Sequence, residues 1–116
     1  MIDIKKALAR FNLIETHPGS YDAQNGWNNN NEGHFTKTCP ADNELVGTIG
    51  NSTAKDYDNV IKTAVDTQKT WRMVPAPKRG ELIKRIGDLV AENMEDLAII
   101  VMLDTGKSLM EAKGEL

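Results

Sequence analysis

The sequence has a single cysteine, Cys39, among its 116 residues. One thiol excludes an internal disulfide framework and is typical of a protein from a reducing compartment. Cys39 precedes a proline inside a predicted hairpin, where we expect neither a histidine nor a helix N-terminus beside it. We therefore expect Cys39 to be a small packed side chain and not a nucleophile.

Aromatic residues are also scarce, at 5% of the chain, and the formal net charge is only −3. Proteins that bind nucleic acids use a basic surface to displace counterions from phosphates, or aromatic rings on which bases stack. The sequence offers neither feature, so we expect no nucleic-acid partner.

No apolar run is long enough to cross a membrane. The longest, Leu97–Leu103, falls far short of the roughly 20 residues that a spanning helix needs. The first residues, MIDIKKALARFNLI, carry Asp3 and lack a cleavage site or the Arg- and Ser-rich bias of a transit peptide. The chain is long enough for one domain at most, and we expect a cytoplasmic protein with no membrane partner.

The first 33 residues combine a short helical period with a polar segment. The spacing predicts a helix from Ile4 to Leu13, which His17–Gly19 ends. Ser20–Gly33 is rich in Asn and Gly, and we expect an irregular surface segment anchored only by Trp27. The sequence thus divides into residues 1–33 and a more regular part, residues 34–116.

The second part opens with a predicted β-hairpin and a capped helix. His34–Thr38 and Leu45–Ile49 are the predicted strands, with a turn-forming segment between them. Thr53 and Asp56 are spaced as an N-cap pair. They begin a helix whose apolar positions, three or four residues apart, continue to Trp71, before two prolines break it.

From Pro77 the apolar spacing predicts one helix that reaches about Asp104. Its last turns, Ala98–Leu103, are apolar throughout and need cover on all sides. Gly106 is expected to supply a left-handed cap with Lys107 near the negative helix end, and Asp104 to hydrogen-bond the turn. Ser108 and Glu111 are spaced as a second capping pair, for a helix that is still running at Leu116. A finished domain rarely stops there, so we expect an N-terminal part of a longer protein.

The residues alone give no complete catalytic or metal-binding set. His17 and His34 are expected to be solvated loop residues. Gly106–Ser108 faintly resembles the end of a phosphate-binding loop, but it follows a helix and lacks that motif's upstream glycine. Lys78 and Arg79 are expected to be solvated or to form salt bridges. The prediction is an α+β segment with exposed apolar faces and no active site.

Three segments, in order, resemble the N-terminal portion of the aldehyde dehydrogenase superfamily. They are CPADNE followed by LVGTI, the capped helix leading to WRMVPAPKRGE, and LDTGK followed by EA-x-GE. With Gly26–Trp27, the first two are most similar to the antiquitin-like subfamily, the α-aminoadipic semialdehyde (piperidine-6-carboxylate) dehydrogenases. Leu103–Thr105 departs from that subfamily, where Glu-Met is expected, and is more similar to the superfamily at large.

The resemblance implies a Rossmann-like α/β parent fold. Residues 34–116 would supply a β-hairpin and three to four helices of its cofactor domain. Superfamily members use NAD(P), a catalytic cysteine in a Gly-Gln-x-Cys setting and a glutamate that activates water; none has a counterpart in this chain. We therefore assign no catalytic, cofactor-binding or metal residue, and expect the NAD-binding residues beyond Leu116. In some relatives the match of Asp104, with carbonyls near the matches of Lys37 and Thr38, helps hold a monovalent cation.

The leading hypothesis is thus the N-terminal portion of an NAD(P)-dependent aldehyde dehydrogenase, inactive alone. Its partners would be the remainder of that chain, an aldehyde (possibly a lysine-derived semialdehyde) and further copies in a homo-oligomer. The aldehyde, the choice between NAD and NADP and the oligomeric state are left open. The alternative is a truncated, non-catalytic paralogue that acts as a small interaction module.

Overall fold

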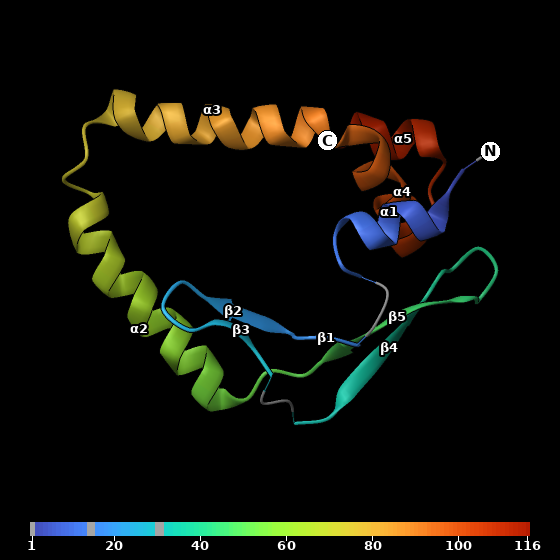
Figure 1. Ribbon diagram of the computed structural model, residues 1–116, viewed down its shortest axis with the longest axis horizontal. Coiled ribbons are helices and arrows are strands. Elements are labelled where there is room, and N and C mark those ends of the chain that lie inside the picture. The colour runs from blue at the N-terminus through green and yellow to red at the C-terminus, as the bar shows by residue number, and fades with distance from the viewer. Residues whose placement is uncertain (1, 14–15, 30–31) are drawn as a thin grey trace.

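The computed structural model describes residues 2–13, 16–29 and 32–116, as a mixed α/β chain (Figure 1). Its radius of gyration is 16.9 Å, with extents of 47 × 36 × 19 Å. A compact domain of this length has a radius of about 13 Å, so the described chain is unusually open. The elements are α1 (Ile4–Arg10), β1 (Thr16–His17), β2 (Ser20–Asp22), β3 (Gly26–Asn28), β4 (His34–Thr38), β5 (Leu45–Gly50), α2 (Ala54–Trp71), α3 (Ala76–Glu92), α4 (Met94–Thr105) and α5 (Leu109–Gly114).

The predicted hairpin of β4 and β5 is confirmed, and it belongs to a three-stranded sheet in the order β1–β5–β4. β4 and β5 are antiparallel, with an irregularity in register between Lys37 and Thr38. The turn between them is closed by Asp42, whose carboxylate accepts a hydrogen bond from the Glu44 amide at 3.0 Å. β1 adds a parallel edge strand; two residues are too short for a sequence pattern to predict.

The expected irregular segment contains a second hairpin, so that prediction is wrong for residues 20–28. β2 and β3 pair with Tyr21 opposite Trp27, and their rings meet edge to face at 5.3 Å. Asp22 organises the turn by accepting hydrogen bonds from the Gln24 and Asn25 amides, both at 2.8 Å. Gly26 then takes a positive φ of 77°. The Asp22 carboxylate, which caps the turn, and the cross-strand pair of Tyr21 and Trp27 therefore stabilise a hairpin in a segment whose polar composition favours irregular structure.

The sequence correctly predicts the start of α2. The Thr53 hydroxyl accepts from the Asp56 amide at 3.1 Å, and the Asp56 carboxylate accepts from the Thr53 amide at 2.8 Å. This is the reciprocal capping box that their spacing predicts. The second box is confirmed at Ser108 and Glu111, which begin α5. α5 ends at Gly114, earlier than the predicted run to Leu116, and α1 likewise ends at Arg10 and not at Leu13.

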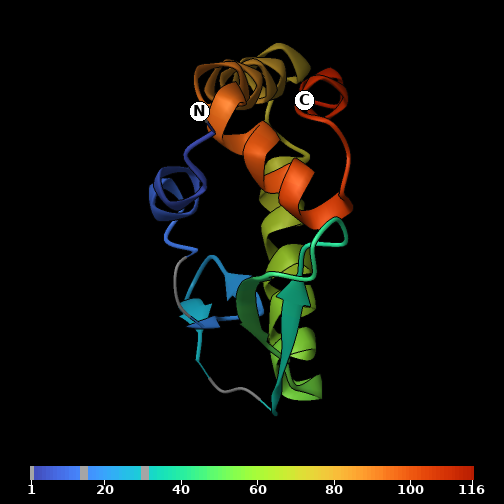
Figure 2. The same cartoon turned by 90° about the vertical axis from the view of Figure 1, so that its right-hand side faces the viewer.

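The single long helix predicted from Pro77 to Asp104 is wrong, because Asn93 divides it into α3 and α4. Asn93 has φ −112° and ψ 13°, outside the helical region. Its side-chain amide donates to the Leu89 carbonyl at 2.8 Å, and its side-chain oxygen accepts from Arg10 Nε at 3.1 Å. The break thus lets α4 turn away from α3 and meet α1 (Figure 2).

The small core lies where α1, β4 and α4 meet. Four buried side chains form it: Ala7, Cys39, Ile99 and Leu103. The expected cover of the apolar α4 is thus confirmed for its core-facing residues, while Ile100, Val101 and Met102 are half-buried. Gly106 caps α4 in the left-handed region, with φ 73°, as predicted. A Cβ there would lie 3.0 Å from Pro40 Cγ, so glycine also lets the helix end approach the β4–β5 turn.

α3 stands apart from this core. It begins with Pro77 in its first turn, as predicted, but none of its described side chains is buried. Leu82, Ile83, Ile86 and Leu89 keep 49%, 63%, 51% and 42% of their surface exposed. Figure 1 shows α3 running across the top of the view, apart from the sheets, with α4 at its C-terminal end.

Candidate functional site

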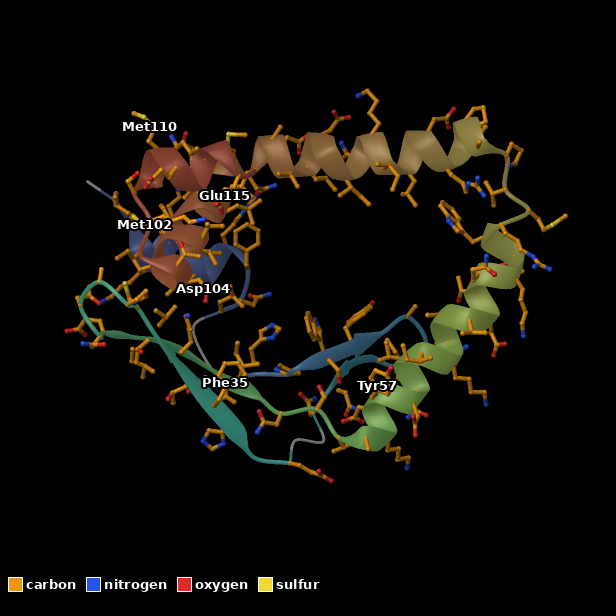
Figure 3. The ribbon with its side chains drawn as sticks, turned by 180° about the vertical axis from the view of Figure 1, so that it is seen from behind. Phe35, Tyr57, Met102, Asp104, Met110 and Glu115 are labelled. Atoms are coloured by element: carbon orange, nitrogen blue, oxygen red, sulfur yellow. The ribbon has the colours of Figure 1, made fainter. Side chains whose placement is uncertain are left out.

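A small apolar cavity of about 140 Å³ lies between α1, the three-stranded sheet and α4. Leu8, Val46 and Ile100 supply apolar walls, while Lys37 and Asp104 supply its charged groups. Lys37 Nζ lies 2.9 Å from Asp104 Oδ1, and their side chains are 33% and 59% exposed. Figure 3 shows Asp104 at the sheet-facing end of α4. A charge pair is therefore the main polar feature of this cavity.

This pair bears on the cation that the family resemblance implies. A monovalent cation at Asp104 needs a free carboxylate surrounded by oxygen ligands. Here the carboxylate already faces the ammonium group of Lys37, which repels a second cation. The residues present do not fit a cation at Asp104, and we assign none.

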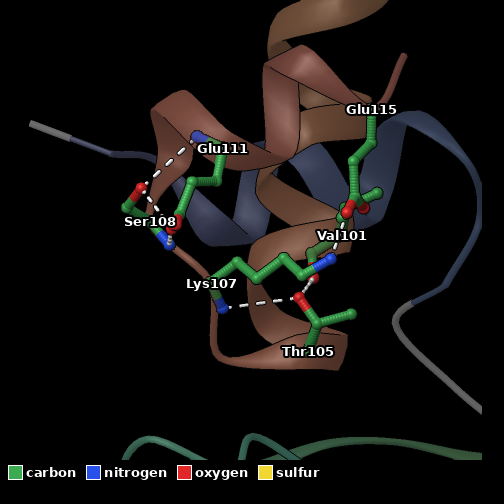
Figure 4. Close-up of polar contacts among 6 residues, drawn as sticks. All are labelled: Val101, Thr105, Lys107, Ser108, Glu111 and Glu115. Atoms are coloured by element: carbon green, nitrogen blue, oxygen red, sulfur yellow. Dashed lines mark hydrogen bonds and ion pairs between the residues drawn. The ribbon is translucent and has the colours of Figure 1, made fainter.

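The turn after α4 is held by Thr105, and the expectation that Asp104 would do so is wrong. The Thr105 hydroxyl donates to the Val101 carbonyl at 2.7 Å and accepts from the Lys107 amide at 3.4 Å (Figure 4). The Lys107 ammonium pairs with Glu115. The Thr105 hydroxyl makes the hydrogen bonds of this turn, so the Asp104 carboxylate can form its ion pair with Lys37 on β4.

The Gly106–Ser108 segment is not arranged as a phosphate-binding loop. Ser108 Oγ accepts from the Glu111 amide at 3.3 Å and donates to the Glu111 carboxylate at 2.7 Å (Figure 4). The hydrogen bonds that the Ser108 hydroxyl and the Ser108 backbone amide donate to the Glu111 carboxylate lower the pKa of Glu111, against a smaller opposing effect of desolvation. The serine hydroxyl is therefore engaged in capping α5.

A larger polar cleft of about 790 Å³ lies beside the start of α2. Three carboxylates line it, from Asp22, Glu32 and Asp56, against the single ammonium of Lys55. A dinucleotide carries a negative pyrophosphate, which needs amide donors at a helix N-terminus or basic side chains. In the described part of the chain this cleft presents the opposite charge. Its residues do not fit NAD, and no cofactor step is assigned to them.

The two buried aspartates of this cleft have structural partners. Hydrogen bonds from the Asn25 side chain and backbone lower the pKa of Asp22. The hydrogen bond from the Thr53 amide is the largest cause that lowers the pKa of Asp56, with the Thr53 and Asn28 side chains adding to it. Both carboxylates stay ionised because they cap backbone turns. Such shifts indicate structural roles as readily as catalytic ones.

The histidines differ from the sequence expectation in one case. His17 is half-buried in β1, its ring 4.4 Å from that of Trp27 at an interplanar angle of 86°. His34 is exposed, on β4. Among residues 2–13, 16–29 and 32–116 no group of three His, Cys, Asp or Glu side chains could hold a metal ion. The His17–Trp27 contact joins β1 to the β2–β3 hairpin.

Cys39 is 5% exposed and packs within the core, as the sequence predicts. Its backbone helps to close the β4–β5 hairpin. The Cys39 amide donates to the Glu44 carbonyl at 2.9 Å, and the Cys39 carbonyl accepts from the Asn43 amide at 2.8 Å. A thiol that is enclosed by apolar side chains is a poor nucleophile. Its role is to fill the space between β4 and α4.

Lys78 is a surface residue in an ion pair, as expected, with its ammonium 3.1 Å from the Glu81 carboxylate. Arg79 donates to the Arg72 carbonyl at 3.5 Å, a long hydrogen bond across the break between α2 and α3. Neither forms part of an anion site. In the described ranges, no helix is both long enough and apolar enough to span a bilayer.

The chain belongs to the aldehyde dehydrogenase family, whose sequence model matches residues 27–116. The chain is 35% identical to the alpha-aminoadipic semialdehyde dehydrogenase of Bos taurus, over 94% of this chain and 20% of that protein. It is 38% identical to aldehyde dehydrogenase family 7 member A1 of Pisum sativum, over 66% of this chain and 15% of that protein. It is also 42% identical to malonate-semialdehyde dehydrogenase 2 of Bacillus mycoides, over 66% of this chain and 16% of that protein.

These relatives confirm the resemblance that the motifs predict, including its similarity to the α-aminoadipic semialdehyde dehydrogenases. The chain spans about a fifth of the length of the curated relatives it matches. The match begins at Trp27, so the β2–β3 turn lies just outside it. Sequence reasoning missed the Asp22 turn, although Asp22 followed by Asn25–Gly26 is a recognisable turn signal.

Proposed function

We propose that this chain is the N-terminal structural portion of an NAD(P)-dependent aldehyde dehydrogenase that oxidises an aldehyde to a carboxylic acid. The observation that carries the proposal is the family match across residues 27–116. The parent fold would be the Rossmann-like α/β fold of the family, with this segment contributing to its cofactor domain. The proposed partners are the remainder of that chain, its aldehyde and further copies in a homo-oligomer.

A lysine-derived semialdehyde is the favoured substrate. Relatives from Bos taurus and Mus musculus are named for alpha-aminoadipic semialdehyde, at 35% and 36% identity over 94% and 90% of this chain. The Bacillus mycoides relative is named for a malonate semialdehyde and covers less of the chain. Both substrates are aldehydes that carry a carboxylate, and this shared chemistry supports a semialdehyde dehydrogenase.

The chain alone is proposed to be inactive. Its carboxylate-lined cleft does not suit a dinucleotide, and Cys39 is enclosed in the core. The exposed apolar face of α3 also argues against the alternative of an independent interaction module, because exposed apolar surfaces promote aggregation. The sequence favours the apolar run Ile99–Leu103 of α4 as the exposed surface, but Ile99 and Leu103 are buried, and the exposed apolar face lies on α3.

A graft tests the proposal. The N-terminal region of the Bos taurus relative is replaced by the matching region of this chain, and NADH formation is followed with α-aminoadipic semialdehyde. We expect turnover by the graft and none by the chain alone. A folded graft without any aldehyde-dependent NADH formation contradicts the proposal.

A further inference from the structure

α4 ends with two sources of negative charge at the same place. Asp104 lies in its last turn, where unpaired carbonyl groups give a helix a partial negative charge, so a carboxylate there is favoured only beside a cation. That last turn contains no basic residue. The next basic residue along the chain, Lys107, directs its ammonium to Glu115. A positive charge for Asp104 therefore has to come from another element.

Lys37 on β4 supplies this charge. Its Nζ lies 2.9 Å from Asp104 Oδ1, within the range of a charge-assisted hydrogen bond, and Figure 3 shows Asp104 at the sheet-facing end of α4. Among residues 2–13, 16–29 and 32–116, every other ion pair lies in the helical part of the chain, residues 66–115. In these ranges the Lys37–Asp104 pair alone joins the sheet to a helix by charge.

The surroundings of the Lys37 ammonium suit a single positive charge. Only 33% of the Lys37 side chain is exposed, and with Val46 and Ile100 it lines the apolar cavity of about 140 Å³. Its aliphatic stem can cover apolar surface while the ammonium meets Asp104. A divalent cation takes about six or more oxygen ligands, whereas Asp104 is the only carboxylate that lines this cavity. One ammonium thus balances one carboxylate.

We propose that the Lys37 ammonium is a built-in counter-ion, which takes the place of the monovalent cation that the family resemblance implies at Asp104. An ammonium and a potassium ion carry the same charge, but the ammonium is attached to β4. It therefore meets Asp104 without the entropy cost of association and at a high effective concentration. The contact between the sheet and α4 is accordingly independent of sodium or potassium in the medium. Opening the space that the ammonium fills creates a site for one of these ions.

Two substitutions at position 37 test the inference. Lys37→Thr removes the ammonium, suits a strand and leaves open space with a hydroxyl oxygen facing it. Lys37→Met also removes the charge but fills the same space with an unbranched apolar side chain, so it is the matched control. Thermal unfolding of both variants and of the unsubstituted chain is measured in sodium, potassium and choline chloride at equal ionic strength. Choline is too large to enter the space that a lysine ammonium leaves.

We expect a cation response in one variant only. The unsubstituted chain and Lys37→Met should melt at the same temperature in all three salts. Lys37→Thr should melt higher in sodium or potassium than in choline, by roughly 4–8 °C once the ion exceeds its Kd about tenfold. Adding Asp104→Asn to Lys37→Thr should abolish the difference. Broadening of the sodium NMR signal, reversed by potassium, should likewise appear with Lys37→Thr and not with the unsubstituted chain.

Each contrary result overturns the inference. Stabilisation of the unsubstituted chain by sodium or potassium over choline shows that an ion binds despite Lys37. The same response in Lys37→Met, or its persistence with Asp104→Asn, places the ion elsewhere. A folded Lys37→Thr chain that is indifferent to the three salts shows that no site was opened. If Lys37→Thr is unfolded in choline, failure of both sodium and potassium to restore its helical circular dichroism has the same meaning.

The graft described above separates this inference from the proposed function. Its melting temperature is compared in the three salts with and without Lys37→Thr, and NADH formation is measured in parallel. The salt pattern in a folded graft that forms no NADH keeps the built-in counter-ion and overturns the proposed function. Its absence from a graft that forms NADH overturns the counter-ion and leaves the proposed function standing.

Discussion

Lys37 on β4 and Asp104 at the end of α4 form an ion pair of 2.9 Å across the edge of the core. They are 67 positions apart in the sequence, and their contact holds the sheet against α4. Because both side chains are partly exposed, water and salt weaken their attraction. The pair therefore fixes geometry more than it adds stability.

The first prediction concerns the strength of this pair. In a double-mutant cycle with Lys37→Met and Asp104→Asn, the coupling energy should be about 0.2–1 kcal/mol. It should fall further as salt is raised, and sodium, potassium and choline chlorides should act alike at equal ionic strength. Specific stabilisation by sodium or potassium in the unsubstituted chain would show that Asp104 holds a cation after all.

Two glycines should respond in opposite directions to alanine. A Cβ on Gly19 would lie 2.0 Å from the Gly50 carbonyl oxygen, which is backbone and cannot move aside. Gly19→Ala should therefore lower the free energy of unfolding by more than 1 kcal/mol. Gly87 on α3 has nothing within 4 Å of such a Cβ, so Gly87→Ala should raise helix stability by about 0.5–1 kcal/mol. Denaturant unfolding of both variants checks the contrast, which equal effects would contradict.

The capping box of α2 should give the chain an acid-sensitive stability. The Thr53 amide lowers the pKa of Asp56 in the folded chain, so this carboxylate stabilises folding above its unfolded pKa. That contribution is lost as the pH falls through the folded pKa, below about pH 4. Asp56→Asn should therefore be less stable than the parent at pH 7, and the difference should shrink at pH 3. An equal difference at both pH values would exclude this linkage.

The hydroxyl of the same box can be tested separately. Thr53→Ala should cost about 1 kcal/mol, because the Asp56 amide loses its acceptor, while Thr53→Ser should retain most of the stability. Thermal unfolding followed by helical circular dichroism measures both. Loss of stability in the serine variant as large as in the alanine variant would point to packing of the methyl group in place of capping.

Cys39 should be chemically silent in the folded chain. It is 5% exposed within the α1–β4–α4 core, so a thiol reagent should react with it only when the chain opens. Reaction should be slow in buffer and complete at once in denaturant. Cys39→Ala in the graft should leave turnover in place. Rapid native labelling, or a graft that is inactivated by Cys39→Ala while still folded, would contradict a packing role.

The sequence predicts the local features of the fold best. Each capping box is formed within four consecutive residues, and the left-handed cap needs only a glycine at position 106. These features depend on short-range sterics and hydrogen bonds, which residue type largely decides. The β4–β5 hairpin is predicted for the same reason, since its turn closes within the segment between the two strands.

The predictions that are wrong concern features that depend on contacts between residues far apart in the sequence. The break between α3 and α4 depends on Asn93, whose side chain binds Arg10, 83 positions away. Asp104 leaves its own turn for Lys37 on another element, which no local pattern indicates. The β2–β3 hairpin was hidden by a polar composition, although cross-strand contact of Tyr21 with Trp27 stabilises it. Of the small cavity between α1, the sheet and α4, the family resemblance indicated Lys37 and Asp104, but as neighbours of a cation and not as an ion pair.

The central claim is that this chain provides structure to an aldehyde dehydrogenase and carries no catalytic centre of its own. The most direct measurement is NADH formation at equal concentrations of the folded chain and of the graft, with the same semialdehyde. Circular dichroism first establishes that both samples are helical. The account predicts aldehyde-dependent NADH from the graft and none from the chain. NADH formation by the chain alone, or its absence from a folded graft, would contradict it.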